Sequence, residues 1–279
     1  MFTLNCKGRL FIIDGPVVMG IINITPDSFY AGSRLHTMDD VLHRAEKMLQ
    51  EGAAILDIGG QSTRPNSQLI SKDEELQRVV PFIEAIIKRF PEAIISVDTF
   101  YGKVAEYAIA AGASIVNDVS AGTMDEELWP IIAKWNVPYI LMHIKGTPQT
   151  MQQYAQYDNV VTDVFDMLNL KIHQLRRMGI NDIIADMGFG FAKNSTHNFQ
   201  LLKHLSYFRQ LNVPLLAGLS RKATIYKTLG ITAADALNGT TVLNTIALLN
   251  GAHILRVHDV KEAVEAIKLL KAYNNMQEV

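Results

Sequence analysis

Eight short apolar runs, each ending at a side chain that can hydrogen-bond, bind a metal ion or titrate, most constrain how this chain can fold. The runs are rich in Val and Ile and apolar at consecutive positions, which is typical of parallel strands covered on their outer face. Segments with helical periodicity separate them. The eight polar residues are Asn23, Asp57, Asp98, Asn117, His143, Asp186, Ser220 and His258.

This order of elements predicts an α/β fold of the (β/α)8 TIM-barrel type. From Asn23 to His258 the strand ends are about 34 residues apart on average, the length of one strand and helix. A parallel barrel brings the C-terminal ends of its strands around one mouth, so the polar residues would converge there as in an enzyme. The alternative is an open doubly wound sheet, but the first strand lacks the GxGxxG motif of a dinucleotide fold.

The length of the chain, 279 residues, suits one such barrel of about 250 residues with additions. No linker divides it, so we expect a single domain over residues 1–279. Residues 1–16, which end in Gly15-Pro16, predict a short N-terminal cover segment such as a hairpin. Ser71 with Glu74 predicts a capping box at a helix start, and Pro81 predicts a kink or a break in that helix.

Composition and charge exclude several classes of protein. The net charge of −2 gives no footprint for nucleic acid or an anionic membrane surface. No apolar run approaches the roughly 20 residues of a membrane span, and the N-terminus does not resemble a secretory signal. Cys6 is the single cysteine, which excludes an intramolecular disulfide and suits a reducing compartment. We therefore expect a soluble cytoplasmic protein.

The segment Asp57–Pro65 has the composition of an anion-binding loop. Two glycines permit a close backbone approach, and the hydroxyl of Thr63 and the guanidinium of Arg64 are donors for an anion. The alternative is an ordinary surface turn, because Gly, Ser and Pro are common loop residues. Its place at a strand end favours the binding site.

Two cationic segments follow the last two strands. Arg221 and Lys222 lie in the corner where these barrels usually bind phosphate, and the alternative is a solvated basic helix start, which opposes the helix dipole. Period-two alternation places Arg256 and His258 on one face, as in a phosphate clamp. The alternative is that His258 caps the next helix while Arg256 pairs with an acid.

Asp98, Asn117 and Asp186 each follow a strongly apolar run and should lie deep in the mouth. A buried carboxylate without a partner is costly, so each must meet donors from the protein or a ligand. A ligand edge with N–H beside NH₂ would satisfy a carboxylate through two parallel bonds. The alternative is a set of structural salt bridges.

The sequence does not favour a resident metal ion. His143 is a lone histidine, and without HxH, HExxH or paired Cys/His a structural zinc site is not expected. Asn23 offers an amide oxygen to a hard cation. Mg²⁺ accepts few protein ligands when a substrate phosphate supplies the others, so we expect Mg²⁺ to arrive with the substrate.

In order along nearly the whole chain, these motifs resemble those of the dihydropteroate synthase family. The similar segments are Asn23–Phe29, Asp57–Pro65, Ser96–Thr99, Asn117–Ser120, Leu141–His143, Asp186–Lys193, Gly218–Lys222 and Arg256–Asp259. The resemblance implies a TIM barrel that forms a homodimer. It also implies condensation of p-aminobenzoate with 6-hydroxymethyl-7,8-dihydropterin pyrophosphate in the presence of Mg²⁺, with sulfonamide drugs imitating p-aminobenzoate in its pocket.

The resemblance also implies a role for each matching residue. The pterin would contact Asp98, Asn117, Met142, Asp186, Lys222 and Arg256. The pyrophosphate would contact Asn23, Thr63, Arg256 and His258, with Asn23 at the metal ion. The p-aminobenzoate would contact Arg64, Pro65, Phe191 and Lys222. The residues expected to act in catalysis are Asp98, Arg64, Lys222, Arg256 and His258, and departure of pyrophosphate would precede attack because the pterin stabilises a cation.

Four positions depart from the commonest pattern of this family: Gln61 for Glu, Met187 for Pro, Ala192 for Gly and Ala223 for Ser. Two alternatives stay open. A corrinoid-linked methyltetrahydrofolate methyltransferase would share the pocket of Asp98, Asn117 and Asp186, but would not need Thr63 with Arg64 or Arg256 with His258. A non-catalytic pterin-binding paralogue is supported only by the departures.

Overall fold

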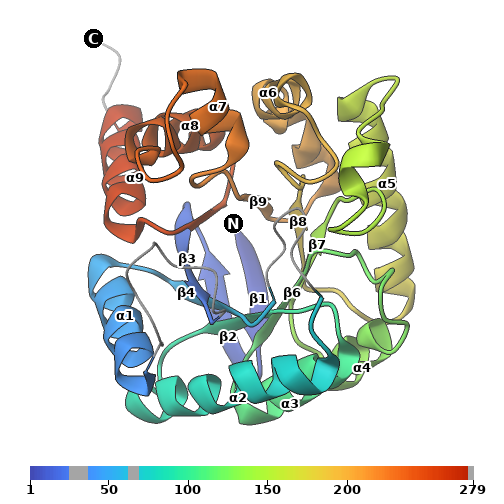
Figure 1. The fold of residues 1–279 in the computed structure, drawn as a ribbon, viewed down its shortest axis with the longest axis vertical. Helices are drawn as coiled ribbons and strands as arrows, with labels where there is room; N and C mark the ends of the chain where they lie inside the picture. The colour runs from blue at the N-terminus through green and yellow to red at the C-terminus, as the bar shows by residue number, and fades with distance from the viewer. Residues whose placement is uncertain (25–36, 62–68, 276–279) are drawn as a thin grey trace.

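The computed structural model describes residues 1–24, 37–61 and 69–275. Within them, eight parallel strands close a barrel in the order β10-β3-β4-β5-β6-β7-β8-β9, and the helices form a ring around the strands (Figure 1). The predicted TIM barrel is therefore confirmed. The barrel strands are β3 Val17–Asn23, β4 Ile55–Gly59, β5 Ile95–Asp98, β6 Ile115–Asp118, β7 Tyr139–Met142, β8 Ile183–Asp186, β9 Leu215–Ala217 and β10 Ile254–Val257.

The helices alternate with these strands and bury one apolar face each against them. The main core lies between the two layers because both present Val, Ile, Leu and Ala to each other. The helices are α1 Met38–Glu51, α2 Lys72–Arg89, α3 Gly102–Ala111, α4 Leu128–Trp135, α5 Val160–Arg177, α6 Ser195–Lys203, α7 Ala223–Leu229, α8 Leu237–Leu249 and α9 Val260–Asn274, with 3-10 turns η1 Met151–Tyr154 and η2 Leu205–Leu211. None of the described helices is long and apolar enough to cross a membrane.

The N-terminal segment is a hairpin that closes the bottom of the barrel, as the sequence predicts. Strands β1 Phe2–Cys6 and β2 Arg9–Ile13 pair antiparallel around Lys7-Gly8, both at positive φ, as a two-residue hairpin turn requires. Leu4, Cys6 and Ile13 are buried in one cluster with the first residues of the barrel strands, such as Ile55 and Ile254. The cover therefore seals the end of the barrel opposite the mouth.

Helix α2 shows how the local predictions compare with the structure. Ser71 Oγ accepts a hydrogen bond of 3.2 Å from Glu74 N, which is one half of the predicted capping box. The Glu74 carboxylate instead pairs with Arg78 at 2.5 Å. The helix runs through Pro81 to Arg89, so Pro81 does not divide it.

Strand β4 extends beyond its predicted end. The sequence places the end at Asp57, whereas the strand continues through Ile58 to Gly59. Asp57 therefore points into the barrel one layer below the rim, with its side chain fully buried. This difference matters for the site.

Candidate active site

A guanidinium with two carboxylates forms the centre of the mouth. Arg256 on β10 donates from Nε to Asp57 Oδ2 at 2.6 Å and from Nη2 to Asp98 Oδ2 at 2.5 Å. Asn117 on β6 donates from Nδ2 to the same Asp57 oxygen at 3.0 Å. The strands β4, β5, β6 and β10 thus place four polar side chains together, which confirms the predicted convergence for Asp98, Asn117 and Arg256.

Burial and charge shape the protonation of this centre. Burial raises the pKa of Asp98, and Arg256 opposes that shift, while Asp57 and other nearby carboxylates add to it. Burial alone would lower the pKa of Arg256, but Asp57 and Asp98 raise it above its ordinary value. Arg256 therefore stays charged. Without a ligand it pairs with two acids, which is the alternative that the sequence left open for this residue.

Asp57 is the residue of this centre that the sequence motifs did not assign to ligand or catalysis. It interrupts an apolar run, and an acid in such a run has to find a donor inside the fold. The position of Asp57 within an apolar run is therefore the sequence feature that could have identified it. The structure provides the donors from Asn117 and Arg256, which lie 60 and 199 residues away in sequence.

Asp186 and Lys222 face each other on the opposite side of the mouth. Asp186 Oδ1 accepts from Gly188 N at 2.7 Å. A Cβ atom placed on Gly218 would lie 3.6 Å from Lys222 Nζ and 3.9 Å from Asp186 Oδ2, so Gly218 leaves space beneath both. Burial lowers the pKa of Lys222 to about 8 and raises that of Asp186, and each group opposes the shift of the other.

Lys222 also contacts the loop after β8. Its Nζ donates to Phe189 O and lies 4.8 Å from the centroid of the Phe191 ring. Phe191 packs against an apolar cluster that contains Met142. The predicted residues Met142, Phe191 and Lys222 therefore form one wall of the mouth, with a cation over an aromatic face.

Gly59 brings the end of β3 close to Asp98. A Cβ atom placed on Gly59 would lie 3.4 Å from Asp98 Cβ and 3.7 Å from Asn23 Oδ1. No described residue hydrogen-bonds the Asn23 side chain, which is partly exposed at the rim. Its amide oxygen is thus available to a ligand or to a hard cation.

Ser220 fixes the orientation of His258. Ser220 Oγ accepts from His258 N at 3.2 Å and lies 3.0 Å from His258 Nδ1. Burial, with help from Arg256, lowers the pKa of His258 to about 4, so the ring is neutral at pH 7. In the tautomer that carries the ring proton on Nε2, Nδ1 accepts from the Ser220 hydroxyl. Helix α9 has Asp259 rather than His258 at its N-cap.

Arg221 and Lys222 have different roles despite being adjacent. Arg221 donates from Nε and Nη2 to Asp259 at 2.9 Å each, and from Nη1 to the Ala234 carbonyl at 2.5 Å. Its backbone is left-handed, with φ of 54°, whereas Lys222 is extended. In the ligand-free structure Arg221 therefore joins the loops after β9 and β10. A ligand role for Arg221 stays a prediction.

The four residues that depart from the common family pattern lie in different local environments. Ala192 has a φ of 49°, a conformation that favours glycine, so it carries strain there. Met187 is fully buried in the core. Gln61 Oε1 accepts from Ile70 N at 3.0 Å. Ala223 begins α7 directly after Lys222.

Several predicted site residues lie outside the described residues. They are Thr63, Arg64 and Pro65, together with residues 25–29 of the Asn23–Phe29 segment. Their roles stay predictions. Among the described residues, no group of three or more His, Cys, Asp or Glu is arranged to hold a metal ion.

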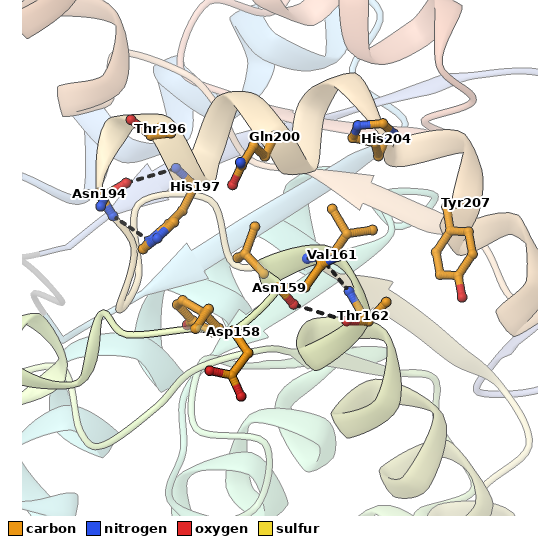
Figure 2. Close-up of a pocket in the computed structure, with 12 residues that line it drawn as sticks. Asp158, Asn159, Val161, Thr162, Asn194, Thr196, His197, Gln200, His204 and Tyr207 are labelled. Atoms are coloured by element: carbon orange, nitrogen blue, oxygen red, sulfur yellow. Dashed lines mark hydrogen bonds between the residues drawn. The ribbon is translucent and has the colours of Figure 1, made fainter.

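A pocket of about 620 Å³ lies away from this mouth, between the starts of α5 and α6. Asn159 and Asn194, the caps of those helices, face it with His197 and Tyr207 (Figure 2). The lining contains none of the predicted site residues. The cluster at the strand ends is therefore the better candidate for the active site.

A closed parallel barrel with buried acids and cations at the carboxyl ends of its strands defines a TIM-barrel enzyme. The model of the pterin binding enzyme family matches residues 19–258. Dihydropteroate synthase of Haemophilus influenzae is 42% identical over 274 residues, covering 98% of this chain and 99% of the relative. The chain belongs to this family of pterin-binding enzymes, among the dihydropteroate synthases, which are transferases.

Solved structures agree with this assignment. Yersinia pestis dihydropteroate synthase in a sulfonamide drug complex superimposes with a TM-score of 0.94 at 39% identity, covering 99% of this chain and 100% of that one. The Xanthomonas albilineans enzyme in complex with 7,8-dihydropteroate gives a TM-score of 0.89 at 36% identity, covering 99% and 100%.

Proposed function

We propose that this protein condenses 6-hydroxymethyl-7,8-dihydropterin pyrophosphate with p-aminobenzoate to give 7,8-dihydropteroate and pyrophosphate. The observation that carries the proposal is the arrangement of Asp186, Lys222 and the Asp57–Arg256–Asp98 group around one mouth. A relative that was solved in complex with 7,8-dihydropteroate, the Xanthomonas albilineans enzyme, matches over 99% of this chain.

Asp186 and Asn117 would read the pterin. Asp186 uses one oxygen for Gly188 N, so Oδ2 is left for the N–H and NH₂ edge of the aminopyrimidinone ring. Lys222 opposite can donate to a ring acceptor. These contacts are charge-assisted and lie in a largely buried site, where they contribute most to specificity.

Arg256 and His258 would hold the pyrophosphate. In the tautomer in which Nδ1 accepts from the Ser220 hydroxyl, the neutral ring of His258 offers Nε2–H to the pyrophosphate. Arg256 keeps donor capacity beyond its bonds to Asp57 and Asp98, since a guanidinium has five N–H groups. The two acids hold its plane in place, so little orientation entropy is lost when the substrate binds.

Mg²⁺ fits this site as a cation shared with the substrate. The Asn23 amide oxygen is a hard donor at the rim, and substrate oxygens and water would complete an octahedral shell. When bound, the ion would neutralise charge on the leaving pyrophosphate. Asn23 is the residue of this chain that would contact it.

The chemistry would proceed by loss of the leaving group before attack. The bond from the exocyclic methylene carbon to the pyrophosphate oxygen breaks, and its electron pair leaves with pyrophosphate. Arg256, His258 and Thr63 stabilise that charge, while Asp98 offsets the positive charge on the pterin. The amine nitrogen of p-aminobenzoate then bonds to the methylene carbon and releases a proton.

The p-aminobenzoate would lie between Phe191, Lys222, Arg64 and Pro65. The aromatic wall suits its ring, and the cations suit its carboxylate. With a pKa of about 8, Lys222 is mostly charged at pH 7. Sulfonamides would occupy the same place.

We further propose a cytoplasmic homodimer with α8 at the interface. Helix α8 contains no charged residue, and Val242, Ile246 and Leu249 are 50%, 36% and 60% exposed along it. An uncharged surface helix with apolar side chains at this spacing fits a second copy of the chain.

A product assay tests the proposed reaction. The purified protein, Mg²⁺, the pterin pyrophosphate and p-aminobenzoate should give 7,8-dihydropteroate by mass spectrometry, together with pyrophosphate. Pterin binding without product would instead favour a non-catalytic paralogue. Methyl transfer from methyltetrahydrofolate to a corrinoid protein would favour the methyltransferase.

A further inference from the structure

Lys193 is a buried lysine with three hydrogen-bond acceptors around its nitrogen. Its Nζ lies 2.9 Å from His143 Nδ1, 3.0 Å from Gly188 O and 2.9 Å from Phe191 O. The residue is 4% exposed. A lysine in this position is costly unless every donor is satisfied, so the site is built around it.

The loop that Lys193 holds has a backbone that needs support. Gly188, Gly190 and Ala192 have φ values of 67°, 83° and 49°, so every second residue is left-handed. This conformation is unfavourable at a residue with a side chain, such as Ala192, because Cβ then crowds the following carbonyl oxygen. Side-chain hydrogen bonds to the loop carbonyls stabilise it.

His143 joins this loop to strand β7. Its side chain is 1% exposed, and burial lowers its pKa to about 2, so the ring is neutral. A Cβ atom on Gly188 would lie 2.0 Å from His143 O, so the loop backbone lies directly against the end of the strand. Nδ1 accepts from Lys193 when the ring proton is on Nε2.

The same loop forms the wall beside Lys222. Phe189 O accepts from Lys222 Nζ, and the Phe191 ring lies 4.8 Å from that nitrogen. Lys193 binds the carbonyl of Phe191 itself. Movement of this carbonyl would therefore move the ring that faces Lys222.

We propose that Lys193, with His143 as its acceptor, is a positioning residue that sets the Phe191 wall of the p-aminobenzoate subsite. This inference rests on the proposed function. Lys193 acts through the loop and not on the substrate, because its three donors are used within the protein. The pterin is read by Asp98, Asn117 and Asp186, which lie on strands β5, β6 and β8. Asp186 alone of these contacts the loop, through Gly188 N, so pterin binding depends less on Lys193 than the Phe191 wall does.

The first experiment compares Lys193→Ala with the wild type. The KM for p-aminobenzoate should rise by at least about tenfold. The Kd for the pterin pyrophosphate, measured by calorimetry, should change by less than about threefold. Lys7→Met is the matched control, because Lys7 also donates to a backbone carbonyl, Ile109 O at 2.7 Å, but lies in the hairpin at the other end of the barrel; both constants should stay at wild-type values.

Chemical rescue separates positioning from general loss of packing. Propylammonium has the chain and donors that Lys193→Ala removes, so at millimolar concentration it should lower the KM for p-aminobenzoate again. Tetramethylammonium at equal ionic strength lacks N–H donors and should have no effect.

The His143 variants test the acceptor and replace the lysine variant if it does not fold. His143→Asn keeps an acceptor near the position of Nδ1 and should stay close to wild type, whereas His143→Leu should raise the KM for p-aminobenzoate. A wild-type KM in both Lys193→Ala and His143→Leu would overturn the inference, and so would an equal loss for both substrates without amine rescue. An inactive wild-type protein would instead contradict the proposed function.

Discussion

Arg256 Nε lies 2.6 Å from the buried carboxylate of Asp57, and these two residues are 199 positions apart in the chain. The contact joins β10 to β4 across the barrel interior, and Asp98 completes it from β5 at 2.5 Å. Asp57 also accepts from Asn117. One carboxylate thus orients two residues proposed to contact the pterin.

Asp57→Asn should therefore weaken both binding and stability. The amide keeps the volume but removes the charge that balances Arg256, and leaving a buried charge or donor unpaired costs about 1–3 kcal/mol or more. We expect a lower melting temperature and at least about tenfold weaker binding of the pterin pyrophosphate by calorimetry. Asp182→Asn, which removes an acceptor for Asn5 N at the other end of the barrel, should leave pterin binding unchanged. Wild-type affinity in Asp57→Asn would remove Asp57 from the site.

Asp186→Asn should separate binding from stability. The change places a donor against the N–H or NH₂ of the pterin, so affinity should fall by at least about tenfold. The melting temperature of the ligand-free protein should hold or rise, because burial already disfavours the charged carboxylate. An early melting transition with unchanged pterin affinity would show that Asp186 is a structural residue.

Removal of divalent metal should stop turnover without unfolding the protein. If Mg²⁺ is shared between Asn23 and the substrate, metal analysis of the purified protein should find no stoichiometric ion. EDTA should abolish product formation, added Mg²⁺ should restore it, and the melting temperature should not change. A transition metal that survives dialysis at one equivalent would contradict this prediction.

Glu75 should make stability fall as the pH rises. This residue of α2 is fully buried, no described residue hydrogen-bonds its carboxylate oxygens, and burial raises its pKa to about 8. Since the ordinary value is 4.5, the folded protein retains a proton that the unfolded chain loses. The contribution to stability is complete below about pH 4.5 and is lost as the pH rises through 8.

Glu75→Gln removes this titration while keeping the shape of the side chain. The variant should gain in melting temperature relative to wild type as the pH rises from 5 to 8.5. Glu74→Gln, at the exposed neighbour that pairs with Arg78, should show no such widening. A constant difference between Glu75→Gln and wild type over this range would refute the assignment.

Ile246→Asp should dissociate the proposed homodimer. A carboxylate in the middle of the apolar α8 face would be desolvated at the interface, which is unfavourable without a partner. Analytical ultracentrifugation should detect a monomer at concentrations where the wild type is dimeric. Leu170→Asp is the control, because Leu170 is 59% exposed on α5, and it should stay dimeric. A monomeric wild type would rule out this interface.

The barrel, the N-terminal hairpin and the residues that reach the mouth from the strand ends all follow from the amino-acid sequence. A polar residue that follows an apolar run lies at the end of a buried strand, and a parallel barrel brings such strand ends together. Asp98, Asn117 and Asp186 follow from that rule. So do Arg256 and His258, through alternation along β10.

How these residues pair with one another depends on the folded chain. Arg221 and Lys222 are adjacent and chemically alike, yet a left-handed backbone at Arg221 sends it to Asp259 while Lys222 reaches the mouth. Asp57 pairs with Arg256, and Lys193 pairs with His143; in each pair the two residues come from distant parts of the chain. A buried charge takes whichever partner the fold brings within about 3 Å, and sequence periodicity carries no information on that distance.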